Sequence, residues 1–154
     1  MAIVYIGLGS NLGDRHKNCL AAVERLRQNG LLVTRQSSLH ETKPWGLTEQ
    51  PDFINMAVEA ETDLGPAELL ELLKIIEKDM GRRGAERWGP RVIDLDILLY
   101  DALTLNSESL TIPHALMHER EFVLKPLSEI AGDMVHPVLG RKISDLLASV
   151  AGKR

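Results

Sequence analysis

The chain has 154 residues, of which 44% are hydrophobic and 26% are charged, and its formal net charge at pH 7 is −4. This length fits one domain, so we expect a single domain over residues 1–154. The acidic balance argues against a general nucleic-acid binder, the single Cys19 excludes a disulfide framework, and no apolar run is long enough for a membrane span. We therefore expect a monomeric, cytoplasmic protein that binds neither nucleic acid nor membranes.

The first 41 residues predict a strand, a helix and a second strand. Residues 3–8 are apolar and β-prone, and the glycines that follow in GLGSNLG (residues 7–13) are interpreted as a tight turn, since their spacing misses the dinucleotide-binding pattern G-x-G-x-x-G. No G-x-x-x-x-G-K-[ST] motif is present either, which excludes a P-loop kinase. Asp14 is placed to cap a helix that ends at Asn29-Gly30, and residues 31–41 predict the second strand. The expected buried stripe of this helix consists of Cys19 with Leu20, Val23 and Leu26.

The central part of the chain predicts a strand and a helix between two polar loops. Residues 42–52 (TKPWGLTEQPD) read as a loop, and residues 53–61 alternate as a strand, with Phe53 and Asn55 on the face opposite its apolar residues. An aromatic ring beside a group that both donates and accepts hydrogen bonds suits a flat heterocycle, although such a pair is also common on protein surfaces. Pro66 opens a helix that Gly81 ends, and residues 82–91 form the second loop. The apolar face of the strand consists of Ile54, Met56, Val58 and Ala60.

The stretch RWGPRVIDLDILLY (residues 87–100) carries two aspartates in an otherwise apolar strand. Because side chains alternate along a strand, Asp94 and Asp96 point to the same face, where two like charges are unfavourable without a positive partner. Paired carboxylates fed by an arginine-rich loop suit a substrate that brings both Mg²⁺ and phosphate. The alternative for the aspartates is a solvated strand face, and the alternatives for the arginines are a solvated basic loop and a nucleic-acid contact. Trp88, in that loop, either stacks on a planar ring or packs the loop down.

The element order is β-α-β-β-α-β, which predicts an α+β, ferredoxin-like sandwich with a mostly antiparallel sheet. A small hairpin at residues 103–105 and 110–112 is expected to follow, and then helices near residues 121–130 and 143–150. The last two helices are expected to cover the second face of the sheet.

Four motifs carry a resemblance to a known family: GSNLGDR, QPDFIN, ERWGPRVIDLDILLY and LTIPH. Essentially from end to end, the chain resembles the bacterial 6-hydroxymethyl-7,8-dihydropterin pyrophosphokinases of folate biosynthesis. The resemblance implies an ATP- and magnesium-dependent enzyme that transfers pyrophosphate from ATP to 6-hydroxymethyl-7,8-dihydropterin and releases AMP. It also implies two Mg²⁺ ions bound with ATP, and a ferredoxin-like fold.

The resemblance further assigns roles to individual residues. Asp94 and Asp96 would hold the metal pair and, with Arg82 and Arg91, form the catalytic group. The residues that would line the pterin pocket are Thr42, Pro44, Phe53, Asn55, Trp88 and Phe122. The residues that would contact ATP are Glu77, Arg82, Arg87, Arg91, Ile97, Thr111, His114 and Arg120. Two alternatives remain. A ferredoxin-like regulatory domain that binds a small ligand needs neither the aspartate pair nor the arginine loop, and a nucleic-acid-binding sandwich should be basic over its sheet.

Overall fold

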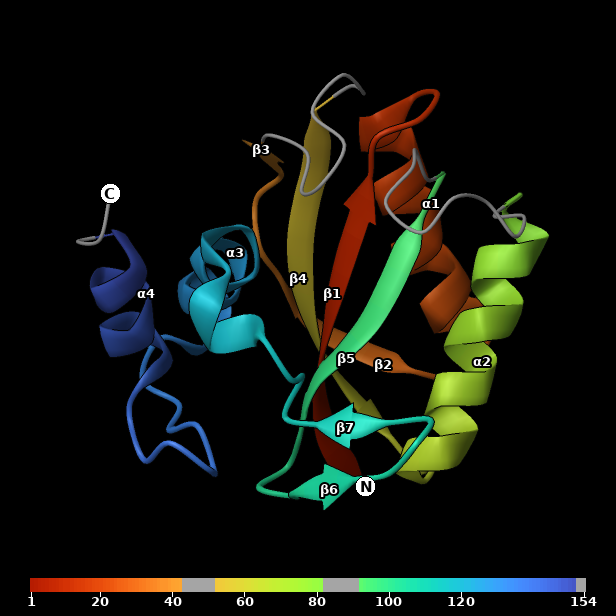
Figure 1. Ribbon diagram of the computed structural model, residues 1–154. Helices are drawn as coiled ribbons and strands as arrows, with labels where there is room; N and C mark the ends of the chain where they lie inside the picture. The colour runs from red at the N-terminus through yellow and green to blue at the C-terminus, as the bar shows by residue number, and fades with distance from the viewer. Residues whose placement is uncertain (43–51, 82–91, 152–154) are drawn as a thin grey trace.

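The computed structural model describes residues 1–42, 52–81 and 92–151, and an antiparallel sheet runs through it (Figure 1). Four strands are hydrogen-bonded in the order β2-β4-β1-β5, and β3 pairs with β4 beside β2. With helices between β1 and β2 and between β4 and β5, this order confirms the predicted ferredoxin-like α+β fold. The strands are β1 (Ala2–Ser10), β2 (Leu32–Gln36), β3 (His40–Thr42), β4 (Phe53–Thr62) and β5 (Asp94–Tyr100).

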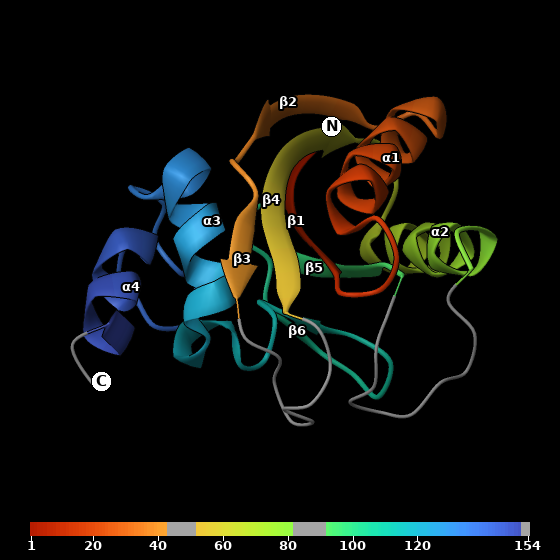
Figure 2. The ribbon, with the colours of Figure 1, turned by 90° about the horizontal axis from the view of Figure 1, so that it is seen from above.

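Helices cover both faces of the sheet (Figures 1 and 2). Helices α1 (Arg15–Gln28) and α2 (Pro66–Asp79) lie on one face, and α3 (Glu121–Ala131) and α4 (Ile143–Ala151) lie on the other. The predicted hairpin is present as β6 (Leu105–Asn106) and β7 (Thr111–Ile112), followed by a short 3₁₀ helix, Met117–Glu119. Within the described ranges, no helix is both long and apolar enough to cross a membrane.

The two faces of the sheet carry two separate hydrophobic clusters. The first lies under α1 and α2, and it includes the predicted apolar face of β4: Ile54, Met56, Val58 and Ala60. The second lies under α3 and α4, where Tyr5, Ala57 and Leu99 of the sheet pack with Leu124 and Leu146. Coverage of the second face, predicted from the two C-terminal apolar segments, is thus confirmed.

Three local predictions are wrong. Gly7 and Gly9 do not form a tight turn, because β1 continues through both, and the positive φ of +75° comes later, at Gly13. Leu20 is 50% exposed and does not belong to the buried stripe of α1, where Ala22 is fully buried instead. Residues 31–41 are not one strand but two, β2 and β3, because the ladder with β4 is interrupted.

A bulge causes that interruption. Ser37 still pairs with Ala57, since its backbone N–H donates to the Ala57 carbonyl and its hydroxyl accepts from the Ala57 N–H, both at 2.9 Å. His40 next pairs with Asn55, so the chain advances three residues (37 to 40) while β4 advances two (57 to 55). One extra residue reverses which side chains face which layer. As a result, His40 and Thr42 share a face with Asn55, whereas Glu41 faces α1.

Candidate active site

Asp94 and Asp96 lie beside a strip of the sheet where the neighbouring strand, β1, has glycines and therefore no side chains. Register places Asp94 opposite Gly9 and Asp96 opposite Gly7, and on the other side of β1 the same glycines lie opposite Asn55 and Ala57. Directly opposed residues of an antiparallel pair share a face of the sheet. The two carboxylates, one half-buried and one exposed, are therefore separated from Asn55 by a floor of glycine backbone.

The Asn55 carboxamide has a fixed orientation. Its Nδ2 donates to Thr42 Oγ1 at 2.6 Å, and its Oδ1 lies only 2.9 Å from the position that a Cβ on Gly9 would occupy. Phe53 Cδ1 is 3.6 Å from that same position, so the ring and the amide border the glycine floor together. The fold thus brings together Thr42, Phe53 and Asn55, which the family resemblance assigned to one pocket.

Glu77 lies against the strand that carries the aspartates. The side chain comes from α2, the residue is 6% exposed, and Oε2 accepts a hydrogen bond of 2.8 Å from the backbone N–H of Leu95. Leu95 lies between the two aspartates at the outer edge of the sheet, so this contact fixes the edge of β5. Ile97, assigned to the ATP site, is 3% exposed, and its side chain belongs to the cluster under α1 and α2.

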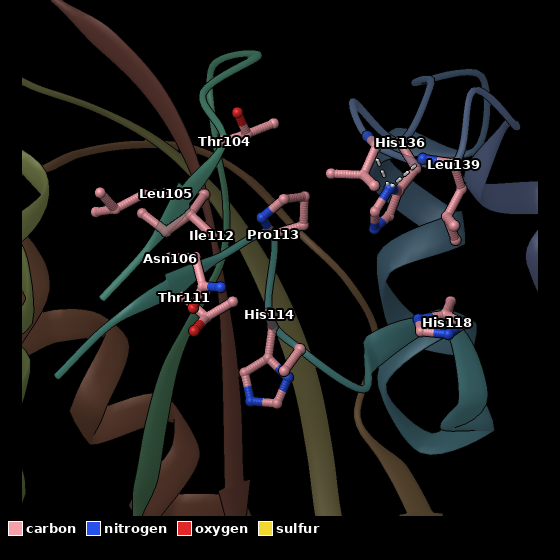
Figure 3. Close-up of a pocket in the computed structure, with 12 residues that line it drawn as sticks. Thr104, Leu105, Asn106, Thr111, Ile112, Pro113, His114, His118, His136 and Leu139 are labelled. Carbon is pink, nitrogen blue, oxygen red and sulfur yellow. Dashed lines mark hydrogen bonds between the residues drawn. The ribbon is translucent and has the colours of Figure 1, made fainter. Parts of the chain in front are cut away.

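Two other residues assigned to ATP, Thr111 and His114, line a pocket of about 400 Å³ (Figure 3). The β6-β7 hairpin and Pro113 form one wall, and His118 and His136 lie across from it. Sequence reasoning missed His118 and His136, which are isolated in the sequence and reach the pocket only through the fold. The Nδ1 atom of His136 accepts hydrogen bonds from the backbone N–H groups of Val138 and Leu139, at 3.2 and 3.1 Å.

His114, which lines this pocket, is partly buried. Its backbone N–H donates to the Leu98 carbonyl at 3.0 Å, which ties it to β5. Burial, and then the nearby Arg120 guanidinium, lower the pKa of the His114 ring. Its Nδ1 atom is buried without a hydrogen-bond partner among the described residues. A neutral imidazole with an unused polar atom can take one hydrogen bond from a ligand.

Phe122 and Arg120 lie together at the start of α3. The Arg120 guanidinium carbon is 5.8 Å from the centroid of the Phe122 ring, within the range of a cation–π contact. A residue assigned to the pterin therefore touches one assigned to ATP. The remaining assigned residues lie outside the described ranges: Pro44, Arg82, Arg87, Trp88 and Arg91.

The donor set at β5 fits magnesium. Asp94 and Asp96 supply hard carboxylate oxygens, the ligand type that Mg²⁺ prefers. No cluster of three or more His, Cys, Asp or Glu side chains in the described part of the chain is placed to hold a metal ion. Mg²⁺ needs no such cage, because it usually keeps waters and takes its remaining ligands from substrate phosphates.

The chain is similar to known proteins in sequence and in fold. Residues 5–132 match the family model described as 7,8-dihydro-6-hydroxymethylpterin-pyrophosphokinase. The chain is 51% identical over 129 residues to a 2-amino-4-hydroxy-6-hydroxymethyldihydropteridine pyrophosphokinase of Bacillus subtilis, covering 83% of this chain and 77% of that protein. It is 48% identical over 147 residues to the folic acid synthesis protein fol1 of Pneumocystis carinii, covering 96% of this chain but 20% of that protein.

Other relatives are also longer than this chain. The chain spans 26% and 24% of the mitochondrial folate synthesis bifunctional proteins of Pisum sativum and Arabidopsis thaliana. Among solved structures, wild-type HPPK-DHPS of Plasmodium falciparum superimposes with a TM-score of 0.79 at 17% identity, covering 99% of this chain and 45% of that one. This likeness supports the fold.

Proposed function

We propose that this chain, which belongs to the 7,8-dihydro-6-hydroxymethylpterin-pyrophosphokinase family, transfers pyrophosphate from ATP to 6-hydroxymethyl-7,8-dihydropterin. The observation that carries this proposal is the strip over Gly7 and Gly9. It separates two carboxylates from an aromatic ring and a fixed amide on the same face of the sheet. A phosphate-bearing substrate and a flat heterocycle can meet there.

On the pterin side, Asn55 and Phe53 supply recognition and Thr42 orients the amide. The amide Oδ1 points over Gly9, where it can accept a hydrogen bond from the edge of a heterocycle. The Phe53 ring borders the same floor and offers apolar surface to a flat ring. Pro44, Trp88 and Phe122 are proposed to complete the pterin pocket.

On the nucleotide side, the acidic pair and the basic residues have complementary tasks. Asp94 and Asp96 would hold two Mg²⁺ ions, which, when bound, would offset phosphate charge and favour ionisation of the attacking hydroxyl. Arg82 and Arg91 would contact the phosphates as part of the catalytic group. The nucleotide contacts are proposed to come from Glu77, Arg82, Arg87, Arg91, Ile97, Thr111, His114 and Arg120.

The proposed reaction is an in-line displacement without a covalent enzyme intermediate. The pterin hydroxyl oxygen bonds to the β-phosphorus of ATP, the bond from that phosphorus to the bridging oxygen on the α-phosphate breaks, and AMP leaves. Asp96, whose side chain is exposed, would accept the hydroxyl proton in addition to binding metal. The monomeric state, the cytoplasmic location and the single domain remain predictions from the sequence.

Product analysis tests the proposal. The chain is incubated with ATP, Mg²⁺ and 6-hydroxymethyl-7,8-dihydropterin, with parallel samples that contain a chelator or that lack the pterin. AMP and a pterin diphosphate should form in equal amounts in the complete mixture and in neither control. Pterin binding without turnover would instead support the regulatory ligand-binding domain.

A further inference from the structure

Each residue of the short edge strand β3 has a partner of its own outside the backbone ladder. His40 and Thr42 face the same side as α3, and Glu41 faces α1. Strand β3 lies between β4 and α3, and its end carries the threonine that orients Asn55 (Figure 2). A three-residue strand gains few ladder hydrogen bonds, so these contacts decide where Thr42 lies.

On the α3 side, the Glu129 carboxylate contacts polar groups of β3 and of the bulge that precedes it. Glu129 Oε1 accepts from the Ser38 backbone N–H at 2.8 Å and from the Ser38 hydroxyl at 2.9 Å. Its Oε2 contacts His40 Nε2. Burial raises the pKa of the Glu129 carboxyl, but the hydrogen bonds from Ser38 and His40 outweigh burial and leave that pKa below its ordinary value. The contacts therefore favour the charged form.

On the α1 side, Arg15 joins β3 to the beginning of β4. Its guanidinium Nη1 is 2.8 Å from Glu41 Oε2 and donates to the Asp52 carbonyl at 2.7 Å. Asp52 directly precedes Phe53, and Glu41 directly precedes Thr42. Arg15 therefore fixes the spacing between the two strand ends whose next residues belong to the proposed pterin site.

These contacts bear on recognition because a carboxamide has two different ends. With Thr42 accepting from Nδ2, Asn55 presents Oδ1 to the glycine floor. If Thr42 were displaced, the amide could turn and present donors where it now presents an acceptor. An amide with the wrong end toward a ligand leaves a polar group unpaired, which costs affinity.

We propose that Glu129 and Arg15 are positioning residues for pterin recognition, which act through Ser38, His40 and Glu41 on Thr42 and hence on the Asn55 amide. This inference rests on the proposed function, because it takes the ligand over Gly9 to be the pterin. Neither residue needs to touch a substrate. Their effect on pterin binding depends on the Thr42 hydroxyl group, whereas an ordinary stabilising contact would act without it.

The test is a mutant cycle with three measurements. Glu129→Ala and Arg15→Ala are each made alone and together with Thr42→Val, which removes the hydroxyl but keeps the side-chain shape. Pterin affinity is measured by calorimetry with a non-hydrolysable ATP analogue and Mg²⁺, and unfolding is followed in parallel. Nuclear magnetic resonance of the Asn55 side-chain amide, without ligands, reports whether the hydrogen bonding and surroundings of this amide change.

Arg35→Ala is the matched control. Arg35 donates to the Ile130 carbonyl of the same helix α3 at 3.1 Å, but it ties that helix to β2 and not to β3. Its loss should affect unfolding while leaving pterin affinity within about twofold. Glu129→Ala and Arg15→Ala should each weaken pterin affinity about five- to tenfold, the equivalent of roughly one hydrogen bond, and should shift the Asn55 amide resonances.

In the Thr42→Val background, either substitution should add less than about twofold. Full additivity, or unchanged Asn55 resonances in both single variants, would overturn the inference. Failure of the proposed function would look different: the wild-type chain itself would not bind the pterin. The resonances would still report whether Glu129 and Arg15 affect the hydrogen bonding and surroundings of the Asn55 amide.

Discussion

Replacing Gly9 with alanine probes the floor of the proposed site with a single methyl group. The added Cβ would lie 2.9 Å from Asn55 Oδ1, about 0.5 Å closer than an ordinary contact of 3.4 Å. The amide cannot simply retreat, because Thr42 lies on its other side and the hydrogen bond between them is already 2.6 Å long. The carboxamide should therefore rotate out of its present orientation.

Gly9→Ala is expected to weaken pterin binding while the protein stays folded. Losing the oriented amide should weaken pterin affinity by about ten- to a hundredfold, the equivalent of about 1.4–2.8 kcal/mol. The close contact of the new methyl group with Asn55 should lower the unfolding free energy by about 1–3 kcal/mol. Replacing a glycine within a strand should raise it by about 0.5–1 kcal/mol. The KM for ATP should change little. Steady-state kinetics and denaturant unfolding measure these quantities separately.

Gly7→Ala is the control for this prediction. The same substitution on the same face of the same strand would place its Cβ 3.4 Å from the Leu98 methyl groups, an ordinary contact. It should leave pterin affinity within about twofold and stability unchanged or slightly raised. If Gly9→Ala bound the pterin as tightly as Gly7→Ala, the placement of the pterin over Gly9 and beside Asn55 would be refuted.

Three further predictions concern charged and titratable groups. Asp94→Ala and Asp96→Ala should each lower kcat by at least about a hundred- to a thousandfold with an unchanged circular dichroism spectrum. Asp63 is an exposed carboxylate at the opposite end of the sheet, so Asp63→Ala should leave kcat unchanged. Near-normal turnover of Asp94→Ala or Asp96→Ala would mean that the pair is only a solvated strand face. Burial raises the pKa of the Cys19 thiol to about 12. A thiol reagent at neutral pH should therefore label Cys19 in the unfolded chain but not in the native protein. Rapid labelling of the native protein would contradict the buried position of Cys19. Because folding lowers the pKa of Glu129, its carboxylate stabilises the fold at pH values above the ordinary carboxyl pKa, and this stabilisation is lost as pH falls through the lowered pKa. Glu129→Gln should therefore make the unfolding free energy depend less on pH on the acid side. An unchanged pH dependence would contradict the contacts with Ser38 and His40.

Much of the fold was predictable because period-two and helical patterns are clean in this chain. Alternation in residues 53–61 predicted both faces of β4, and Pro66 and Gly81 predicted where α2 begins and ends. The bulge between β2 and β3 was not predictable, because it depends on the Ser37 hydroxyl replacing a backbone group opposite Ala57. No local pattern distinguishes such a serine from one in a continuous strand.

The residue types of the candidate site were predictable from the sequence, but the glycine floor between them was not. Asp94 and Asp96 stood out because charged residues interrupt an apolar strand. Gly7 and Gly9 were interpreted as a turn because glycine weakens strands. A strip of sheet without side chains can be recognised only once the neighbouring strands are known. The partners of β3 were equally hidden, since Ser38 and Glu129 are 91 residues apart in the sequence.

The fate of the β-phosphorus tests the assigned chemistry most directly. The chain is given Mg²⁺, 6-hydroxymethyl-7,8-dihydropterin and ATP that carries a radioactive label at the β-phosphorus, and the products are separated after partial turnover. Attack at that phosphorus predicts that the label moves to the pterin diphosphate, that the AMP formed is unlabelled, and that Asp94→Ala and Asp96→Ala suppress the transfer. Label recovered in ADP beside a pterin monophosphate would contradict the mechanism.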